Sequence, residues 1–216
     1  MQPPLLPLFP LQAVLFPRTP MPLHIFEERY REMIGEVLVD KGAEFGIVLV
    51  TDKGIASLGC TAVIDRVIER YDDGRLDIAT SGRRRFEIQS VNEERSFLRG
   101  RVEFFDDDVQ EPVEAAAPEE RERATEVWKE LSHFAGVEHE PHWTDPQVSF
   151  QIASAIPDLE FRQSLLGIRS ETRRLKQIAE YLPAYLRKQK YTQHIQQVAP
   201  RNGHGKRRVE EQQGGD

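Results

Sequence analysis

The sequence predicts an α+β protein in which a β-barrel-like N-terminal half with one inserted helix is followed by an all-α helical bundle. Proline fixes φ and removes a backbone donor, so only strands and tight corners fit a segment that contains Pro7, Pro10, Pro17, Pro20 and Pro22. β-Branched runs separated by short turns then continue to about residue 105. After residue 118, apolar residues instead recur every three or four positions, which is typical of helices.

The inserted helix is expected between Phe26 and Asp40, where apolar residues such as Met33 and Val37 share one face. A continuous apolar run at residues 45–51 predicts a strand that is buried on both faces. Further strands are expected at 60–71, 76–80 and 97–105, with a hairpin turn at 72–75 and a bulge or corner at Gly82. Short turns between consecutive strands favour an antiparallel meander curled into a barrel, with the helix closing one side or end.

A change in composition marks the start of the helical half. Residues 103–126 contain ten acidic and two basic residues, which predicts a linker at about 106–120 between a β domain (1–110) and a helical domain (111–198). Helices are expected at 118–135, from an N-cap at Thr144 to Pro157, at 159–166 after a cap at Asp158, and from a cap at Ser170 onward. Pro183 is expected to kink the last helix, and residues 199–216 to form a disordered tail.

Composition narrows the classes of partner. The net charge of −7 and the pI of about 5.5 argue against general binding to nucleic acid or to anionic membranes, since both require clustered cations. Cys60 is the single cysteine, so no internal disulfide can form, which suits a reducing compartment. The N-terminus has no uninterrupted apolar stretch of the kind found in secretory signals, and no window reaches the ~18 apolar residues that span a bilayer. The sequence predicts a cytoplasmic protein with no membrane partner.

Four sequence blocks occur in an order that resembles the N-terminal, substrate-binding domain of Lon proteases: LPLFPLQAVLFP with PLHIFEERYREMI, then FGIVLV (45–50), LGCTAVIDRV (58–67) and SGRRRFEI (81–88). In the helical half the resemblance extends more loosely to Gln163, Leu165, Leu166, Arg174 and Leu175. It implies a PUA-like β-barrel fold followed by a helical bundle, and recognition of protein substrates. Full Lon proteases continue into an ATPase and a serine–lysine protease domain, so a chain of 216 residues is expected to be a stand-alone recognition module without either.

The function that we expect is therefore non-catalytic recognition of unfolded or peptide segments of client proteins, with presentation to a separate ATP-dependent protease as a further step. The residues predicted to contact a client lie near the first corners of the chain: Phe16, Met21, Phe26 and Tyr30. Each has a core position as its alternative, which is favoured for Phe26 and Tyr30. No cofactor or metal is expected.

Two alternatives come from other classes of protein. Because some PUA-like folds bind RNA, Arg83 and Arg84 are candidate anion contacts, although neighbouring residues on a strand point to opposite faces; Arg85 is expected to pair with a carboxylate. A hydrolase would need Cys60 as a nucleophile, or a metal bound by His133, His139 and His142. Packing is the favoured role of Cys60, and the histidine spacing fits no strong zinc pattern. His24 could act as a base only if a carboxylate such as Glu27 or Glu28 oriented it.

Overall fold

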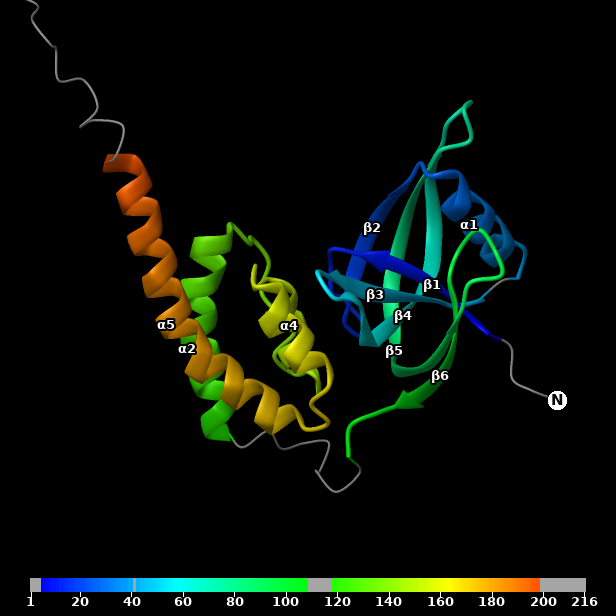
Figure 1. The fold of residues 1–216 in the computed structure, drawn as a ribbon. Coiled ribbons are helices and arrows are strands. Elements are labelled where there is room, and N and C mark those ends of the chain that lie inside the picture. Colours follow the sequence, from blue (N-terminus) through cyan, green and yellow to red (C-terminus); the bar gives the residue numbers. More distant parts are fainter. Residues whose placement is uncertain (1–4, 41, 109–117, 199–216) are drawn as a thin grey trace, which may run out of the picture.

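The structure is a computed structural model and describes residues 5–40, 42–108 and 118–198, the side chains of 196–198 excepted (Figure 1). The described part of the first half contains six strands and one helix: β1 (Leu6–Leu11), β2 (Pro20–Ile25), α1 (Glu28–Val39), β3 (Phe45–Thr51), β4 (Gly54–Arg70), β5 (Leu76–Asn92) and β6 (Arg99–Phe105). The second half contains the helices α2 (Pro118–Ala135), α3 (Val148–Ser154), α4 (Leu159–Leu166) and α5 (Glu171–Val198). In Figure 1, α4 faces the strands, while α2 and α5 lie on its far side.

The six strands form one mixed sheet in the order β2-β5-β4-β3-β1-β6. β6 also pairs with β5, so the pairings from β5 through β4, β3, β1 and β6 return to β5. The expected antiparallel meander is wrong for the first two strands: β1 is parallel to β3, with Leu8 opposite Gly46, and β2 pairs with β5. Between β1 and β3 the chain passes through β2 and α1, and a connection of this length lets it return in the same direction.

The hairpin of β4 and β5 is longer than the sequence suggested. Its turn is the predicted one, with Gly74 at a φ of 86°. β4 already begins at Gly54, however, whereas the sequence placed its start at Cys60. Gly59 resembles a strand breaker, but it lies within β4, opposite Phe86. Glycine is required there because a Cβ would lie 2.4 Å from the Phe86 ring. The resulting hairpin extends past the other strands (Figure 1).

The irregularity predicted at Gly82 is confirmed, because the pairing of β4 with β5 shifts register between Ala62, opposite Gly82, and Cys60, opposite Arg85. Gly82 also has a role that the sequence did not suggest. It lies within the continuous strand β5, and it pairs through its backbone with the corner before β2: the Arg18 amide donates to its carbonyl (2.8 Å), and its amide donates to the Thr19 carbonyl (3.0 Å). A Cβ at Gly82 would lie 2.0 Å from the Phe16 carbonyl oxygen. This close approach holds the corner in place, with Arg18 in the left-handed region at a φ of 60°.

The larger of two apolar clusters runs from the sheet into the helices, and a smaller one contains Leu8, Val48 and Phe86. α1 buries Tyr30, Met33, Ile34 and Val37, and the ring of Tyr30 packs on Phe9 at 4.1 Å between centroids. Across the boundary between the two halves, Phe16 stacks on Phe150 of α3 at 5.3 Å. The two halves are thus joined by apolar packing as well as by polar contacts.

The helical half follows the sequence prediction closely. α2 spans the predicted residues, and Gly136 follows it at a φ of 66°. The Asp158 side chain accepts from the Phe161 amide and caps α4, and Ser170 accepts from the Arg173 amide at the start of α5. The predicted N-cap at Thr144 is wrong: α3 begins at Val148, because the Asp145 side chain accepts from the Gln147 amide (2.7 Å) and holds a turn there.

Some predictions lie outside the described residues, namely the centre of the linker (109–117) and the tail (199–216). Pro183 lies inside α5. In the part of the chain that the structure describes, no helix is both long and apolar enough to cross a bilayer.

Candidate functional site

A buried ionic network joins the sheet to the helices. Asp107, which follows β6, accepts hydrogen bonds from Arg85 of β5 (2.6 Å) and from both terminal nitrogens of Arg174 of α5 (2.6 Å each). Arg174 also donates to Glu171 (2.8 Å), whose carboxylate accepts from the amide and hydroxyl of Ser149 in α3. The Arg85 side chain is 2% exposed and that of Arg174 is 0% exposed, so neither cation is compensated by water. The expected pairing of Arg85 with a carboxylate is confirmed.

The network changes the proton affinities of its acids. Burial alone would raise the pKa of Asp107, but its hydrogen bonds with Arg174 and Gln147 and the charges of the two arginines outweigh burial and lower the pKa to about 2. For Glu171, which lies deeper, burial prevails and raises the pKa in spite of Arg174 and Ser149. Asp107 is therefore the anion that binds the two halves together at neutral pH.

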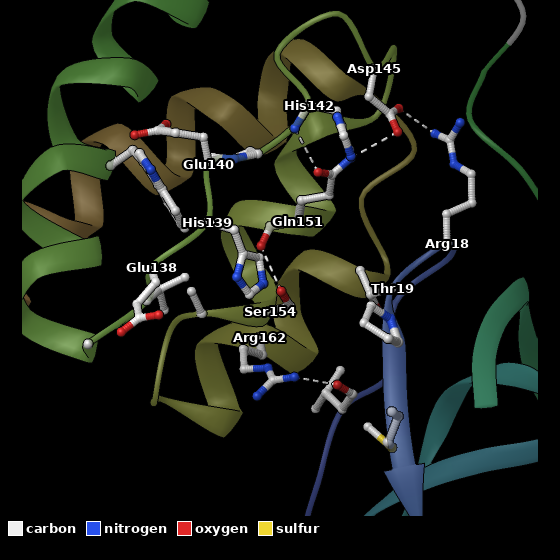
Figure 2. Close-up of a pocket in the computed structure, with 18 residues that line it drawn as sticks. Arg18, Thr19, Glu138, His139, Glu140, His142, Asp145, Gln151, Ser154 and Arg162 are labelled. Atoms are coloured by element: carbon white, nitrogen blue, oxygen red, sulfur yellow. Dashed lines mark hydrogen bonds and ion pairs between the residues drawn. The ribbon is translucent and has the colours of Figure 1, made fainter. Parts of the chain in front are cut away.

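Beside this network, a cleft of about 790 Å³ separates the corner before β2 from the helical half (Figure 2). One wall comes from residues 14 and 18–21, and the other comes from Trp128, the loop 136–142, Asp145, α3 and α4. Apolar groups make up much of the lining: Val14, Pro20, Met21, Trp128, Val137, Pro141 and Ala155. Its size and its mainly apolar walls with a few polar groups are those of a binding site.

Polar contacts hold the loop side of the cleft in place. Arg18 donates across the cleft to Asp145 (2.6 Å), as Figure 2 shows, and also to Gln147 (3.0 Å). The other oxygen of Asp145 accepts from Gln151 (3.0 Å), and the side-chain oxygen of Gln151 accepts from the His142 amide (2.9 Å). These contacts fix the His142 end of the loop relative to the corner at Arg18.

Arg162 of α4 is the other cation of the cleft. One of its terminal nitrogens donates to the Val14 carbonyl (2.5 Å), and its guanidinium lies 5.6 Å from the centre of the Phe16 ring. Its Nε is buried and has no hydrogen-bond partner among the described residues. Burial lowers the pKa of Arg162, and no other influence on it is resolved.

The structure brings only one of the four predicted client contacts into the cleft, namely Met21. Phe16 is 0% exposed and Tyr30 is 6% exposed, so both side chains belong to the core. For Tyr30 this is the position that the sequence favoured. Phe26 was also expected in the core but is 61% exposed, beside the His24 ring and away from the cleft.

The two candidate anion contacts, Arg83 and Arg84, are both exposed on β5, where its pairing with β4 shifts register. Arg84 pairs with Glu44 (3.1 Å), and its guanidinium lies 3.7 Å above the centre of the Phe104 ring. Arg83 is exposed on the neighbouring position of the strand.

The candidate catalytic residues are also separated. Cys60 is fully buried, and burial raises the pKa of its thiol to about 12, so it is not a ready nucleophile. His139 and His142 line the cleft, but His133 does not, and the described residues include no group of three or more potential metal ligands. The sequence had suggested Glu27 or Glu28 as the carboxylate beside His24. In the structure, His24 pairs with Asp77 instead (2.5 Å).

Sequence reasoning missed most of the cleft. Trp128 and Ala155 looked like ordinary helical positions, and Arg162 carried no motif. The loop at 136–142 was predicted as a break between helices, with His139 and His142 considered only as metal ligands. The cleft forms because the chain brings Val14 and Arg162 together over a separation of 148 positions, which no local pattern reports.

A strand-rich half with one inserted helix, joined across an apolar cleft to a helical half, defines a two-part α+β recognition domain. Residues 5–198 match the family described as the ATP-dependent protease La (LON) substrate-binding domain, and the chain belongs to this family. The crystal structure of a Lon N-terminal domain protein from Xanthomonas campestris is similar at 27% identity, with a TM-score of 0.67 over 83% of this chain and 99% of that one.

Two further proteins are similar to this chain. The N-terminal domain of a Lon protease from the Mycobacterium avium complex shares the fold at 16% identity, with a TM-score of 0.58 over 83% of this chain and 98% of that domain. A Lon protease of Porphyromonas gingivalis is 31% identical over 102 residues, or 44% of this chain. The matched region spans 12% of the length of that protease.

Proposed function

We propose that this chain recognises other proteins by binding their unfolded or extended segments in the cleft between the corner before β2 and the loop 136–142. The observation that carries the proposal is the cleft itself, with its largely apolar lining and a few placed polar groups. Unfolded segments expose apolar side chains, which such walls can remove from water. Membership of a family of substrate-binding domains supports the same function.

The proposal assigns binding and no bond cleavage to this chain. Cys60 lies in the core with a raised pKa, away from the cleft. A bound client would be handed to a separate ATP-dependent protease, since the relatives of this domain include a Lon protease. The two halves, 1–110 and 111–198, act together in this scheme, the first as a PUA-like barrel built on the circuit of strand pairings and the second as a helical bundle.

The test compares an unfolded client with the same protein in its folded form. A labelled test protein that has been reduced and carbamidomethylated cannot refold, and its binding can be followed by fluorescence anisotropy. The unfolded form should bind and the native form should not. Equal affinity for the two forms, or no binding of either form, would contradict the proposal.

A pair of variants places binding in the cleft. Ser154→Trp adds a large side chain at an exposed position of the cleft, where the serine hydroxyl donates only to the Gln151 carbonyl. Ser164→Trp is the matched control, because Ser164 is also exposed, bonds in the same way to Phe161, and lies outside the cleft. Ser154→Trp should weaken binding of the unfolded client at least about tenfold, or ~1.4 kcal/mol, with Ser164→Trp unchanged.

Phe26 is the other predicted contact that reaches the surface. If it forms a second point of contact for a client, Phe26→Ala will weaken binding, while Ile68→Ala, at another exposed apolar side chain on the sheet half, will not.

RNA binding through Arg83 and Arg84 predicts instead a steep dependence of affinity on salt, which a titration with single-stranded RNA would measure.

A further inference from the structure

The feature of the cleft that its apolar lining does not explain is Arg162. The two fully buried arginines described above, Arg85 and Arg174, share the carboxylate of Asp107. Arg162 has one carbonyl acceptor, from Val14, and no acidic side chain forms an ion pair with it in the described chain. A partly buried cation without a counter-ion is unfavourable, and an anion that enters the cleft would relieve this.

The surroundings of Arg162 favour an anion attached to an apolar group. Met21, Val14 and Ala155 line the same cleft, and Figure 2 shows Arg162 close to Ser154 and His139. Two acids of the loop line the cleft: Glu140 accepts from the Trp143 indole (3.3 Å), and the Glu138 side chain is exposed to solvent, which screens its charge. Arg18 is already neutralised by Asp145. Attraction between opposite charges is stronger beside apolar groups than in bulk water, so the preference for an anion should be concentrated at Arg162.

We propose that the cleft binds the C-terminal end of an unfolded polypeptide, with the α-carboxylate on Arg162 and the last side chain against the apolar wall at Met21. This inference rests on the function proposed above and names the part of the client that is recognised. A carboxylate matches the planar, forked donors of a guanidinium. The last residue of a polypeptide is preceded by backbone but not followed by it. An internal Asp or Glu has peptide groups on both sides and would bring both against the apolar wall.

The experiment uses the full chain and three labelled peptides of the same short, apolar sequence. The first ends in a free leucine carboxylate, the second in the leucine amide, and the third is an amide with one internal glutamate. At pH 7 the free carboxylate is ionised, so anisotropy titrations should show that the first peptide binds about tenfold more tightly than the other two, a difference of ~1.4 kcal/mol.

Variants assign the preference to one side chain. Arg162→Gln should bind the acid and the amide equally, Arg162→Lys should keep a reduced preference for the acid, and Arg173→Gln, at an exposed position outside the cleft, should match the unchanged protein. If Arg162→Gln does not fold, as judged by circular dichroism, the reduced preference of Arg162→Lys carries the test. A preference that survives in Arg162→Gln, or is unchanged in Arg162→Lys, would overturn the inference.

The outcomes separate this inference from the function on which it depends. If the acid and the amide bind the unchanged protein equally well, the cleft binds clients but does not read the carboxylate, and the inference is wrong. If the peptide with internal glutamate binds as tightly as the free acid, recognition of a chain end is wrong. If no peptide and no unfolded client binds, the proposed function itself fails.

Discussion

Replacement of Asp107 by alanine tests whether the buried network joins the two halves. The variant removes the acceptor of three charged hydrogen bonds, each 2.6 Å long, and leaves two buried arginines with Glu171 as the only carboxylate in their network. Removing one partner from a buried ion pair costs about 3–5 kcal/mol, because the remaining charge is uncompensated. For a chain of this size, each kcal/mol lowers Tm by roughly 2–4 °C, so we expect a decrease of about 10 °C.

The neighbouring residue provides the matched control. Asp108 pairs with Arg169 at 3.2 Å, but its side chain is 63% exposed. Asp108→Ala should therefore lower the free energy of unfolding by less than about 1 kcal/mol. Urea unfolding followed by circular dichroism measures both variants, and an Asp107→Ala protein no less stable than Asp108→Ala would refute the assignment.

The pH dependence gives an independent check on Asp107. Its pKa is lower in the folded chain than in the unfolded chain, so its charged form stabilises the fold above the ordinary pKa of 3.8. That stabilisation is lost as the pH falls from 3.8 towards about 2. The difference in unfolding free energy between the unchanged protein and Asp107→Ala should shrink over this window, and a difference that stays constant would contradict the assignment.

Three substitutions and one chemical reaction probe individual parts of the fold. Gly82→Ala should destabilise the protein by about 1–3 kcal/mol in urea unfolding, because the new methyl group meets the Phe16 carbonyl, whereas Gly35→Ala, with open space in α1, should stabilise it by about 0.5–1 kcal/mol. Cys60 should resist iodoacetamide at pH 8 in the folded protein and react in urea, as followed by mass spectrometry; rapid labelling of the folded protein would show that the thiol is not buried. Asp158→Ala removes the N-cap of α4 and should lower the unfolding free energy by about 1–2 kcal/mol, so an unchanged urea midpoint would show that the cap contributes little.

Much of the secondary structure could be predicted because its causes are local. The bounds of β3 and α2, the turn at Gly74 and the caps at Asp158 and Ser170 each depend on a few neighbouring residues. The resemblance to the Lon family, carried by four blocks in order, predicted the family to which the chain belongs.

The wrong predictions share a different cause. β1 pairs with β3 in parallel, although β2 and α1 lie between these two strands in the chain. Phe26 is a large apolar residue of the kind found in cores, but it lies on the surface. It precedes α1, which begins only at Glu28 and turns its buried face, with Tyr30, towards the sheet. A local pattern identifies an apolar face without showing what covers it.

The sequence by itself determined which elements form, where many of them begin and end, and to which family they belong, since short-range hydrogen bonds, turn geometry and apolar spacing are written in adjacent residues. Only the tertiary structure decided where a client could bind. Met21 and Trp128 line opposite walls of one cleft, and Asp107 lies between two arginines from different halves, because folding brings distant parts of the chain together. Their charges and apolar surfaces act together only once the chain is folded.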